Sequence, residues 1–112
     1  MPSPERLKRR ADFLHLAASG RKAPMPGVVL QAAARGDDGP VRVGFTVTRK
    51  VGNAVIRNRT RRRLKEAARL LLRDEPLRGV DLVLIGRDKT RDRPFEALQG
   101  DLRRALAKVG LL

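Results

Sequence analysis

The chain has 112 residues, and 41% of them are hydrophobic, which is enough for one core but too little for two independent domains. It carries 26 Lys+Arg against 12 Asp+Glu, and the resulting formal net charge of +14 predicts a polyanionic partner, foremost nucleic acid. The sequence has no cysteine, which excludes disulfides and thiolate metal sites, and it has no apolar run of membrane-spanning length and no signal-peptide core. We therefore expect a soluble cytoplasmic protein with no membrane partner, monomeric in the absence of its nucleic acid.

The N-terminal segment, residues 1–10, has prolines at positions 2 and 4 and then a basic cluster with few apolar side chains. This composition predicts a flexible basic arm ahead of a single domain over residues 11–112. A short helix is expected over residues 11–19, because Phe13, Leu14 and Leu16 supply apolar contacts and Gly20 ends the run.

Two strands are expected next. Residues 28–34 have the composition of a strand between the breaker Pro24-Met25-Pro26-Gly27 and a turn cluster over residues 36–40. From Val41 to Thr48 apolar residues alternate with polar residues or glycine, which is the period of a strand with one buried face. The turn between the two segments predicts that they pair as a hairpin.

The apolar period changes to 3.6 residues between positions 53 and 73, which predicts a long helix. The stripe expected to face the core consists of Ile56, Thr60, Leu64, Ala67 and Leu71.

Residues 80–86 are almost continuously apolar, which is typical of a central strand covered on both faces or of a strand parallel to its neighbour. Pro94 opens a final helix, in which apolar residues recur at helical spacing until Gly110. The order helix, strands, helix, strand, helix predicts an α+β fold, a single-domain α/β sandwich with helices packed on a small sheet.

The sequence contains no constellation typical of protein-based catalysis. His15 is the only histidine, Cys and Tyr are absent, and no spaced carboxylate pair lies in apolar sequence. His15 lies between two leucines of the short helix, where a position at the surface or the core edge is the commoner role. The phosphate-binding patterns GxGxxG and GxxxxGK[ST] are also missing. We therefore predict no catalytic residue, no metal site and no bound cofactor in the protein itself.

Positions 49–73 hold ten Lys/Arg and a single acidic residue, Glu66. Like charges one helical turn apart, such as Arg57 and Arg61, repel by roughly a few tenths of a kcal/mol per pair. A merely solvated helix face usually mixes charges of both signs, so this pattern favours phosphate binding.

The most specific motif of the chain is Val51-Gly52-Asn53-Ala54-Val55-Ile56-Arg57-Asn58-Arg59, followed by Arg61-Arg62. It resembles the signature of the bacterial ribonuclease P protein family. The resemblance extends to Asp12-Phe13, to Ser19-Gly20, to Arg42-Val43-Gly44-Phe45-Thr46-Val47, and to the apolar strand with its final helix. Nearly the whole chain is covered.

The resemblance implies a fold like domain 2 of ribosomal protein S5, with a left-handed βαβ crossover that departs from the usual right-handed rule. It also implies a division of labour within ribonuclease P. The catalytic RNA subunit cleaves precursor tRNA and requires Mg²⁺, while the protein is a non-catalytic subunit that binds this RNA and the 5′ leader. The protein would thereby assist the endonucleolytic step that gives the mature tRNA 5′ end.

By resemblance, the leader lies in a central cleft between the first helix and the sheet. The expected floor positions are Phe13, Ala17, Val29, Gln31 and Thr46, and the expected positions on the signature helix are Arg57, Asn58, Arg61 and Lys65. The family often has aromatic rings where this chain has Ala17 and Gln31. Base stacking is therefore expected to be weaker here, and electrostatics more important. Phe13 is either a stacking residue or the core anchor of the first helix.

Helical phase divides the cations of the long helix between two flanks. With Thr60 at the centre of the stripe, the four leader-binding positions fall on one flank, at roughly 60° to 160°. Arg59, Arg62 and Arg63 fall on the other flank, which we predict to face the RNA subunit. The full set predicted for this RNA is Arg9, Arg10, Arg49, Lys50, Asn53, Arg59, Arg62 and Arg63.

Two other function classes share the charge of this chain. A ribosomal protein or RNA chaperone would share the charge and fold but need not carry the motif Arg57-Asn58-Arg59. A DNA-binding module would insert the basic helix into a major groove, but this helix is flanked by strand crossovers and has no helix-turn-helix partner. Stimulated maturation of a precursor tRNA by the cognate catalytic RNA at low Mg²⁺ would separate the three classes.

Overall fold

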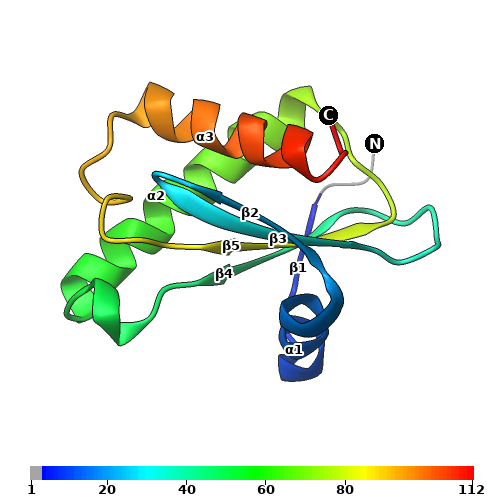
Figure 1. Ribbon diagram of the computed structural model, residues 1–112, viewed down its shortest axis with the longest axis horizontal. Coiled ribbons are helices and arrows are strands. Elements are labelled where there is room, and N and C mark those ends of the chain that lie inside the picture. The colour runs from blue at the N-terminus through cyan, green and yellow to red at the C-terminus, as the bar shows by residue number, and fades with distance from the viewer. Residues whose placement is uncertain (1–3) are drawn as a thin grey trace.

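The computed structural model describes residues 4–112, whose course is shown in Figure 1. The strands are β1 (Glu5–Arg6), β2 (Arg21–Met25), β3 (Val28–Ala34), β4 (Arg42–Thr46) and β5 (Val80–Ile85). The helices are α1 (Arg10–Ser19), α2 (Ala54–Asp74) and α3 (Phe95–Lys108), and a 3-10 helix, η1 (Arg49–Val51), precedes α2. The strands form one mixed sheet in the order β1-β4-β5-β3-β2. The predicted α+β sandwich is confirmed.

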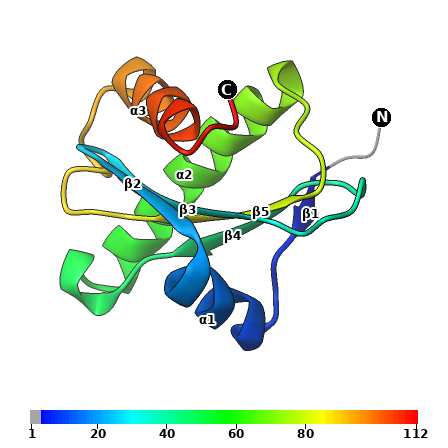
Figure 2. The same ribbon diagram turned by 45° about the vertical axis from the view of Figure 1, so that its right-hand side comes forward.

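The sheet lies between two unequal helical layers (Figure 2). α2 and α3 cover one face, where the main core includes Leu30 and Leu82. α1 covers part of the other face, where Leu7, Leu16 and Val83 form a smaller cluster. Because successive residues of a strand point to opposite faces, β3 and β5 contribute to both clusters. The face beside α1 remains partly open.

α2 connects two adjacent parallel strands, β4 and β5. In Figure 1 both strands run from right to left, and α2 returns above the sheet from left to right. The path from β4 through α2 to β5 has the left-handed turn that the resemblance implies, against the right-handed rule for such crossovers.

The N-terminal segment corrects the prediction of a flexible arm over residues 1–10. Residues 1–3 lie outside the described residues, but Glu5 and Arg6 form β1 and pair in parallel with β4. Leu7 is 3% exposed and belongs to the smaller core cluster, and Arg10 already begins α1. One apolar side chain and the otherwise unpaired edge of β4 hold this segment in the fold.

The hairpin of the sheet is formed by β2 and β3, and the prediction that β3 pairs with β4 is wrong. β2 pairs antiparallel with β3 across the turn Pro26-Gly27, and β5 lies between β3 and β4. The expected breaker is therefore the turn itself, and Pro24 is tolerated because β2 is an edge strand. A Cβ on Gly27 would lie 2.8 Å from Oδ2 of Asp101, so only glycine fits this turn.

The long helix, the central strand and the final helix are confirmed. The Asn53 side chain caps α2 by accepting a hydrogen bond from the Ile56 amide at 3.0 Å. The predicted stripe faces the core, where Thr60 and Leu64 are at most 1% exposed. The Thr60 hydroxyl donates to the Ile56 carbonyl at 2.8 Å, which satisfies the polar group in this stripe.

Asp101 of α3 is fully buried and connects distant parts of the fold. Its carboxylate accepts hydrogen bonds from the Gly27 amide at 2.9 Å and from Arg93 and Arg104 at 3.0 and 2.8 Å. Burial raises the pKa of Asp101, but these hydrogen bonds outweigh burial and hold the pKa below its ordinary value. The β2–β3 turn is thereby tied to α3.

Candidate nucleic-acid interface

The open face of the sheet presents rows of cross-strand neighbours. The register gives one row of Val29, Ile85 and Thr46, and a second row of Gln31, Val83 and Gly44. Residues two apart along a strand point to the same face, so both rows belong to the α1 side. Val29, Gln31 and Thr46, which were predicted as floor positions, therefore lie on one surface.

Phe13 and Ala17 belong to the helix that covers this face. A Cβ on Gly44 would lie 2.5 Å from the Phe13 ring, so the ring rests directly on the second row. Phe13 is half-buried in the smaller core cluster, and Ala17 is exposed. Phe13 is thus a core contact with one part of its ring still accessible.

Gln31 is the buried polar residue of the floor. It is 7% exposed, and its side-chain amide forms no hydrogen bond with the residues that the structure describes. Within residues 4–112, the buried side-chain nitrogens and oxygens without a hydrogen-bond partner are Nε of Arg63 and Nε of Arg93, so the Gln31 amide itself reaches the surface of the cleft. The Gln31 amide is therefore accessible to a ligand that enters the cleft.

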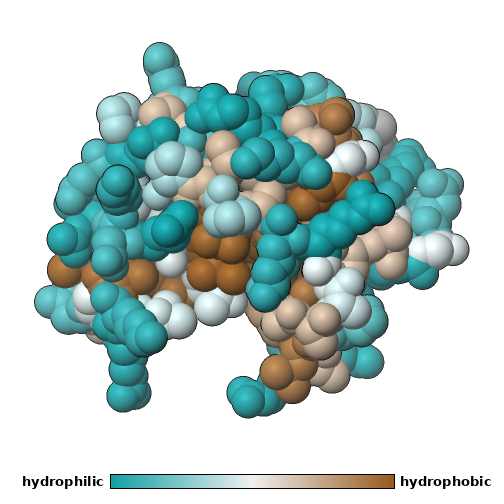
Figure 3. Space-filling model, viewed as in Figure 1, coloured by the Kyte–Doolittle hydropathy of each residue, from teal (hydrophilic) through white to brown (hydrophobic). Residues whose placement is uncertain are grey.

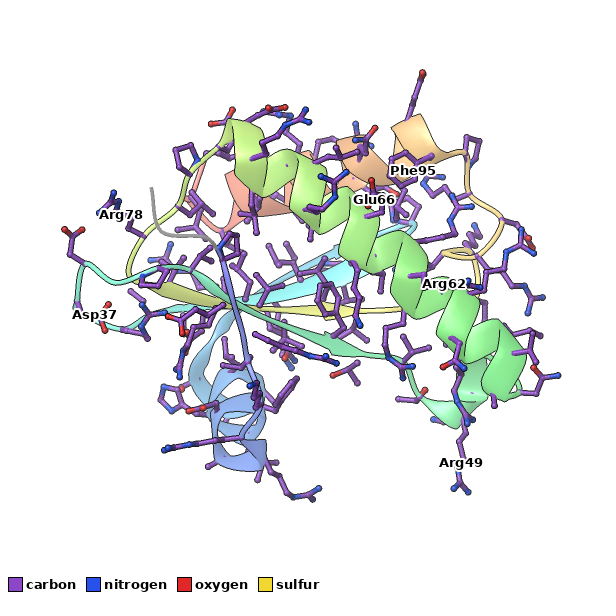
Figure 4. All side chains as sticks on the ribbon, turned by 180° about the vertical axis from the view of Figure 1, so that it is seen from behind. Asp37, Arg49, Arg62, Glu66, Arg78 and Phe95 are labelled. Carbon is purple, nitrogen blue, oxygen red and sulfur yellow. The ribbon has the colours of Figure 1, made fainter. Side chains whose placement is uncertain are left out.

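Two walls flank the floor. α1 forms one wall, and the segment around η1, which follows β4, forms the other. Figure 3 shows the molecule hollowed between them. Arg49 of η1 points to the same side of the sheet as α1 (Figure 4). The cleft thus joins an apolar and amide-bearing floor to a cationic wall.

A second basic surface lies along the opposite face, between α2 and β1. We call it the α2 basic groove, and it is lined by Arg6, Val55, Asn58, Arg61, Arg62 and Lys65. The Lys65 ammonium lies 6.0 Å from the centre of the Phe45 ring, which packs against the core on the α2 side. Asn58, Arg61 and Lys65 were predicted to line the leader cleft, but the structure does not bring them to its floor.

Arg62 was predicted to lie on a different edge from Arg61, but it lines the same groove. The reason is helical phase, because Asn58 and Arg62 are one turn apart and both lie on the outer side of α2. Two flanks that diverge from a buried stripe approach each other again on the side away from the core. The predicted separation into two edges therefore fails at Arg62.

Three further predicted RNA-binding residues make contacts within the protein. Arg57 donates to the Gly52 carbonyl at 3.3 Å, and Asn53 caps α2. Arg63 donates to the Arg91 carbonyl at 3.0 Å and also to the Arg93 carbonyl. Arg63 therefore holds the loop before α3 against α2.

The remaining predicted residues are exposed and lie on separate elements. Arg9 and Arg10 are at the N-terminus of α1, Lys50 is in η1, and Arg59 is on α2. The set predicted for the RNA subunit is thus spread over three elements of the fold.

The cations between Arg49 and Lys65 have no acidic partner within residues 4–112. Nine arginines outside this segment pair with carboxylates within residues 4–112, and two of them, Arg35 and Arg42, converge on buried Asp81 at 2.8 and 2.6 Å. Burial raises the pKa of Asp81, but hydrogen bonds from both arginines outweigh it and lower the pKa below its ordinary value. The positive charge of the segment from Arg49 to Lys65 is therefore not neutralised by the protein.

Sequence reasoning missed the buried carboxylates and the position of Arg6. Asp81 interrupts an apolar strand, and Asp101 follows Leu98 by three residues on the buried stripe of α3, so both carried a signal. Arg6 carried no such signal, because its place depends on strand pairing with β4.

Among residues 4–112, no group of three potential metal-ligating side chains is found. No helix in this range is long and apolar enough to cross a membrane.

These features define a small basic RNA-binding protein with a left-handed βαβ crossover. Residues 1–110 match the family model described as Ribonuclease P. The chain therefore belongs to the ribonuclease P protein family, whose members take part in tRNA processing.

Curated relatives and solved structures agree with this assignment. The ribonuclease P protein component of Gluconacetobacter diazotrophicus is 68% identical over 106 residues, covering 95% of this chain and 91% of the relative. That of Paramagnetospirillum magneticum is 52% identical, covering 96% and 84%. The RNase P protein of Staphylococcus aureus superposes with a TM-score of 0.76 at 25% identity, covering 95% of both chains. That of Thermotoga maritima gives 0.75 at 29% identity, covering 89% and 93%.

Proposed function

We propose that the chain is the non-catalytic protein subunit of a ribonuclease P whose RNA subunit removes the 5′ leader from precursor tRNA. The observation that carries the proposal is the basic segment from Arg49 to Lys65, which has no acidic partner within residues 4–112. A folded protein gains nothing from such a cluster on its own, since its like charges repel. Phosphates of a bound RNA convert this repulsion into affinity.

The leader is proposed to lie on the open face beside α1. Val29, Gln31 and Thr46 belong to a floor that spans β3, β5 and β4, and the accessible part of Phe13 offers a surface on which a base of the leader can stack. Arg49, predicted for the RNA subunit, is reassigned to the leader phosphates because it lines this side.

The RNA subunit is proposed to bind the α2 basic groove. Arg61, Arg62 and Lys65 act there as one phosphate-binding surface. In this arrangement the opposite faces of the sheet contact different RNAs, so the protein connects the substrate leader to the catalytic RNA.

Mg²⁺ is proposed to act at the RNA subunit, with the protein improving the binding of substrate and RNA. The protein alone is then expected to leave precursor tRNA intact. We further propose that the chain works in the cytoplasm and is monomeric until it meets the RNA subunit.

The test is cleavage of a precursor tRNA by the cognate catalytic RNA at low Mg²⁺, with and without purified protein. The protein is expected to stimulate formation of the mature 5′ end. Arg61→Ala combined with Arg62→Ala should lose most of the stimulation, while the control Arg103→Ala on exposed α3 should keep it. Absence of stimulation by the unmodified chain would refute the proposal.

A further inference from the structure

A second hollow continues from the α2 basic groove along the same face of the molecule. We call it the β1 groove. It lies between the C-terminal half of α2 and the β1–β4 edge, and its volume is about 650 Å³. Val43, Phe45, Ala68 and Leu72 are among the apolar residues that line it. Figure 4 shows this side of the molecule, where β1, the edge strand of the sheet, runs in front of the other strands and below the C-terminal end of α2.

Cations surround this apolar floor. Arg6, Lys65, Arg69, Arg73 and Arg78 line the β1 groove, and Glu5 is the carboxylate among its lining residues. Arg69 and Arg73 pair with Glu66 and Asp74, but these pairs are exposed, and phosphate oxygens compete well with such partners. A ligand with an apolar planar part and attached anionic groups matches this surface.

Arg6 and Lys65 line both grooves, so the two form one continuous track. From Lys65 to Leu72 the helix rises about 10 Å, which leaves room for one or two nucleotides beyond the basic groove. The half-buried Phe45 ring lies on the floor, and Lys65 lies above it, 6.0 Å from its centre. A ring beside a cation is a common platform for an unstacked base next to its phosphate.

We propose that the β1 groove binds an unstacked nucleotide of a single-stranded RNA segment. Its base lies on the apolar floor beside Phe45, and its phosphate lies between Arg6 and Lys65. The inference rests on the proposed function, because the segment that enters this groove continues the one bound along the N-terminal half of α2. It adds a base-binding site on the face opposite the leader floor.

The probe is a 12-nucleotide oligouridylate with one 4-thiouridine, bound to the full chain and crosslinked by light. Crosslinked residues are mapped by mass spectrometry. A matching oligonucleotide with abasic positions measures the contribution of the bases. The unmodified protein is expected to crosslink at Phe45 or Leu72, and to prefer the base-bearing strand by about 5- to 10-fold, as stacking of a base predicts.

Phe45→Leu removes the half-buried ring while keeping the groove apolar and its charge unchanged, and should lower the crosslink yield at Leu72 and reduce the base preference while leaving the salt dependence of binding unchanged. The double variant Arg69→Gln/Arg73→Gln removes two exposed cations that line the β1 groove. It should lower both the salt dependence of oligonucleotide binding and the crosslink yield. Arg103→Gln removes a charge of similar exposure on α3 and should change neither. Val29→Glu, on the opposite face, should leave the β1 groove crosslinks intact.

Crosslinks confined to the α1 face would overturn the inference while leaving the proposed function standing. So would displacement of the groove crosslinks by an acidic amphipathic peptide that binds more tightly than the oligonucleotide. Failure of the protein to bind the oligonucleotide and to stimulate the catalytic RNA would instead refute the proposed function itself.

Discussion

Two regions of this protein use arginine side chains in opposite ways. Around Asp81 and Asp101, arginines converge on buried carboxylates and join strands, turns and α3. From Arg49 to Lys65 the cations have no acidic partner within residues 4–112. The net charge alone does not distinguish these regions. The positions of the carboxylates do, because they decide which cations remain for a nucleic acid.

The largest expected effect is on stability, at the paired region. Asp101→Ala leaves Arg93 and the Gly27 amide without their buried acceptor, and should lower the free energy of unfolding by about 3–5 kcal/mol. The matched control is Glu75→Ala, which removes an exposed ion pair with Arg103 and should cost at most about 1 kcal/mol. Urea denaturation of both variants makes the comparison. Equal losses would mean that the buried network contributes no more than a surface pair.

The second effect is a decrease in the free energy of unfolding at acid pH. It should be smaller than the decrease caused by Asp101→Ala. The pKa values of Asp81 and Asp101 lie below their ordinary value of 3.8 in the folded protein. A lowered pKa contributes stability that is complete above the unfolded value and is lost as pH falls through the folded value. The free energy of unfolding should therefore decline below about pH 4, and less steeply in Asp81→Asn and Asp101→Asn. An identical pH profile in all three proteins would contradict this assignment.

The third effect separates two neighbouring cations of α2. Arg63→Ala removes the hydrogen bonds to the loop before α3 and should cost about 1–2 kcal/mol of stability. Arg59→Ala changes an exposed side chain, so its stability should stay within about 0.5 kcal/mol. If Arg59 contacts a phosphate, its loss should lower the salt slope of RNA binding by about 0.7 to 0.9. Thermal unfolding and binding at several salt concentrations measure both. A reversed pattern would show that the loop contact of Arg63 is dispensable.

Local sequence pattern predicted the elements whose burial follows a simple period. The stripe around Thr60 and Leu64 specified α2, and the apolar run from Val80 to Ile85 specified the central strand. Pairing between distant strands was not predictable in the same way. Nothing local to residues 35–41 shows that β5 enters the sheet between β3 and β4. The handedness of the crossover came from family resemblance and not from the residues.

The candidate site likewise contains residues whose positions could be predicted and residues whose positions depend on distant strand pairing. Family resemblance named Val29, Gln31 and Thr46 as floor positions, and the register of the sheet puts these three residues on one face. The phase of α2 correctly gave its buried stripe, but phase alone could not say what lies beside each flank. That depends on β1, whose two residues carry no strand signal of their own. Arg62 was misplaced because the two flanks of α2 approach each other again on the side away from the core, where Arg62 and Arg61 line one groove.

The most direct test of the two-face account compares Val29→Glu with Arg62→Ala in the reconstituted holoenzyme. Affinity is measured for precursor tRNA, for mature tRNA and for the RNA subunit. Val29→Glu places a carboxylate on the leader floor and should weaken precursor binding about fivefold, since one like charge at close range costs about 1 kcal/mol in water. Binding of mature tRNA and of the RNA subunit should be unchanged.

Arg62→Ala and Arg61→Ala, made as separate variants, should each weaken binding to the RNA subunit. Both should leave the preference for precursor tRNA over mature tRNA intact. Equal losses for precursor and mature tRNA in all three variants, or loss of the leader preference in Arg61→Ala alone, would contradict the account.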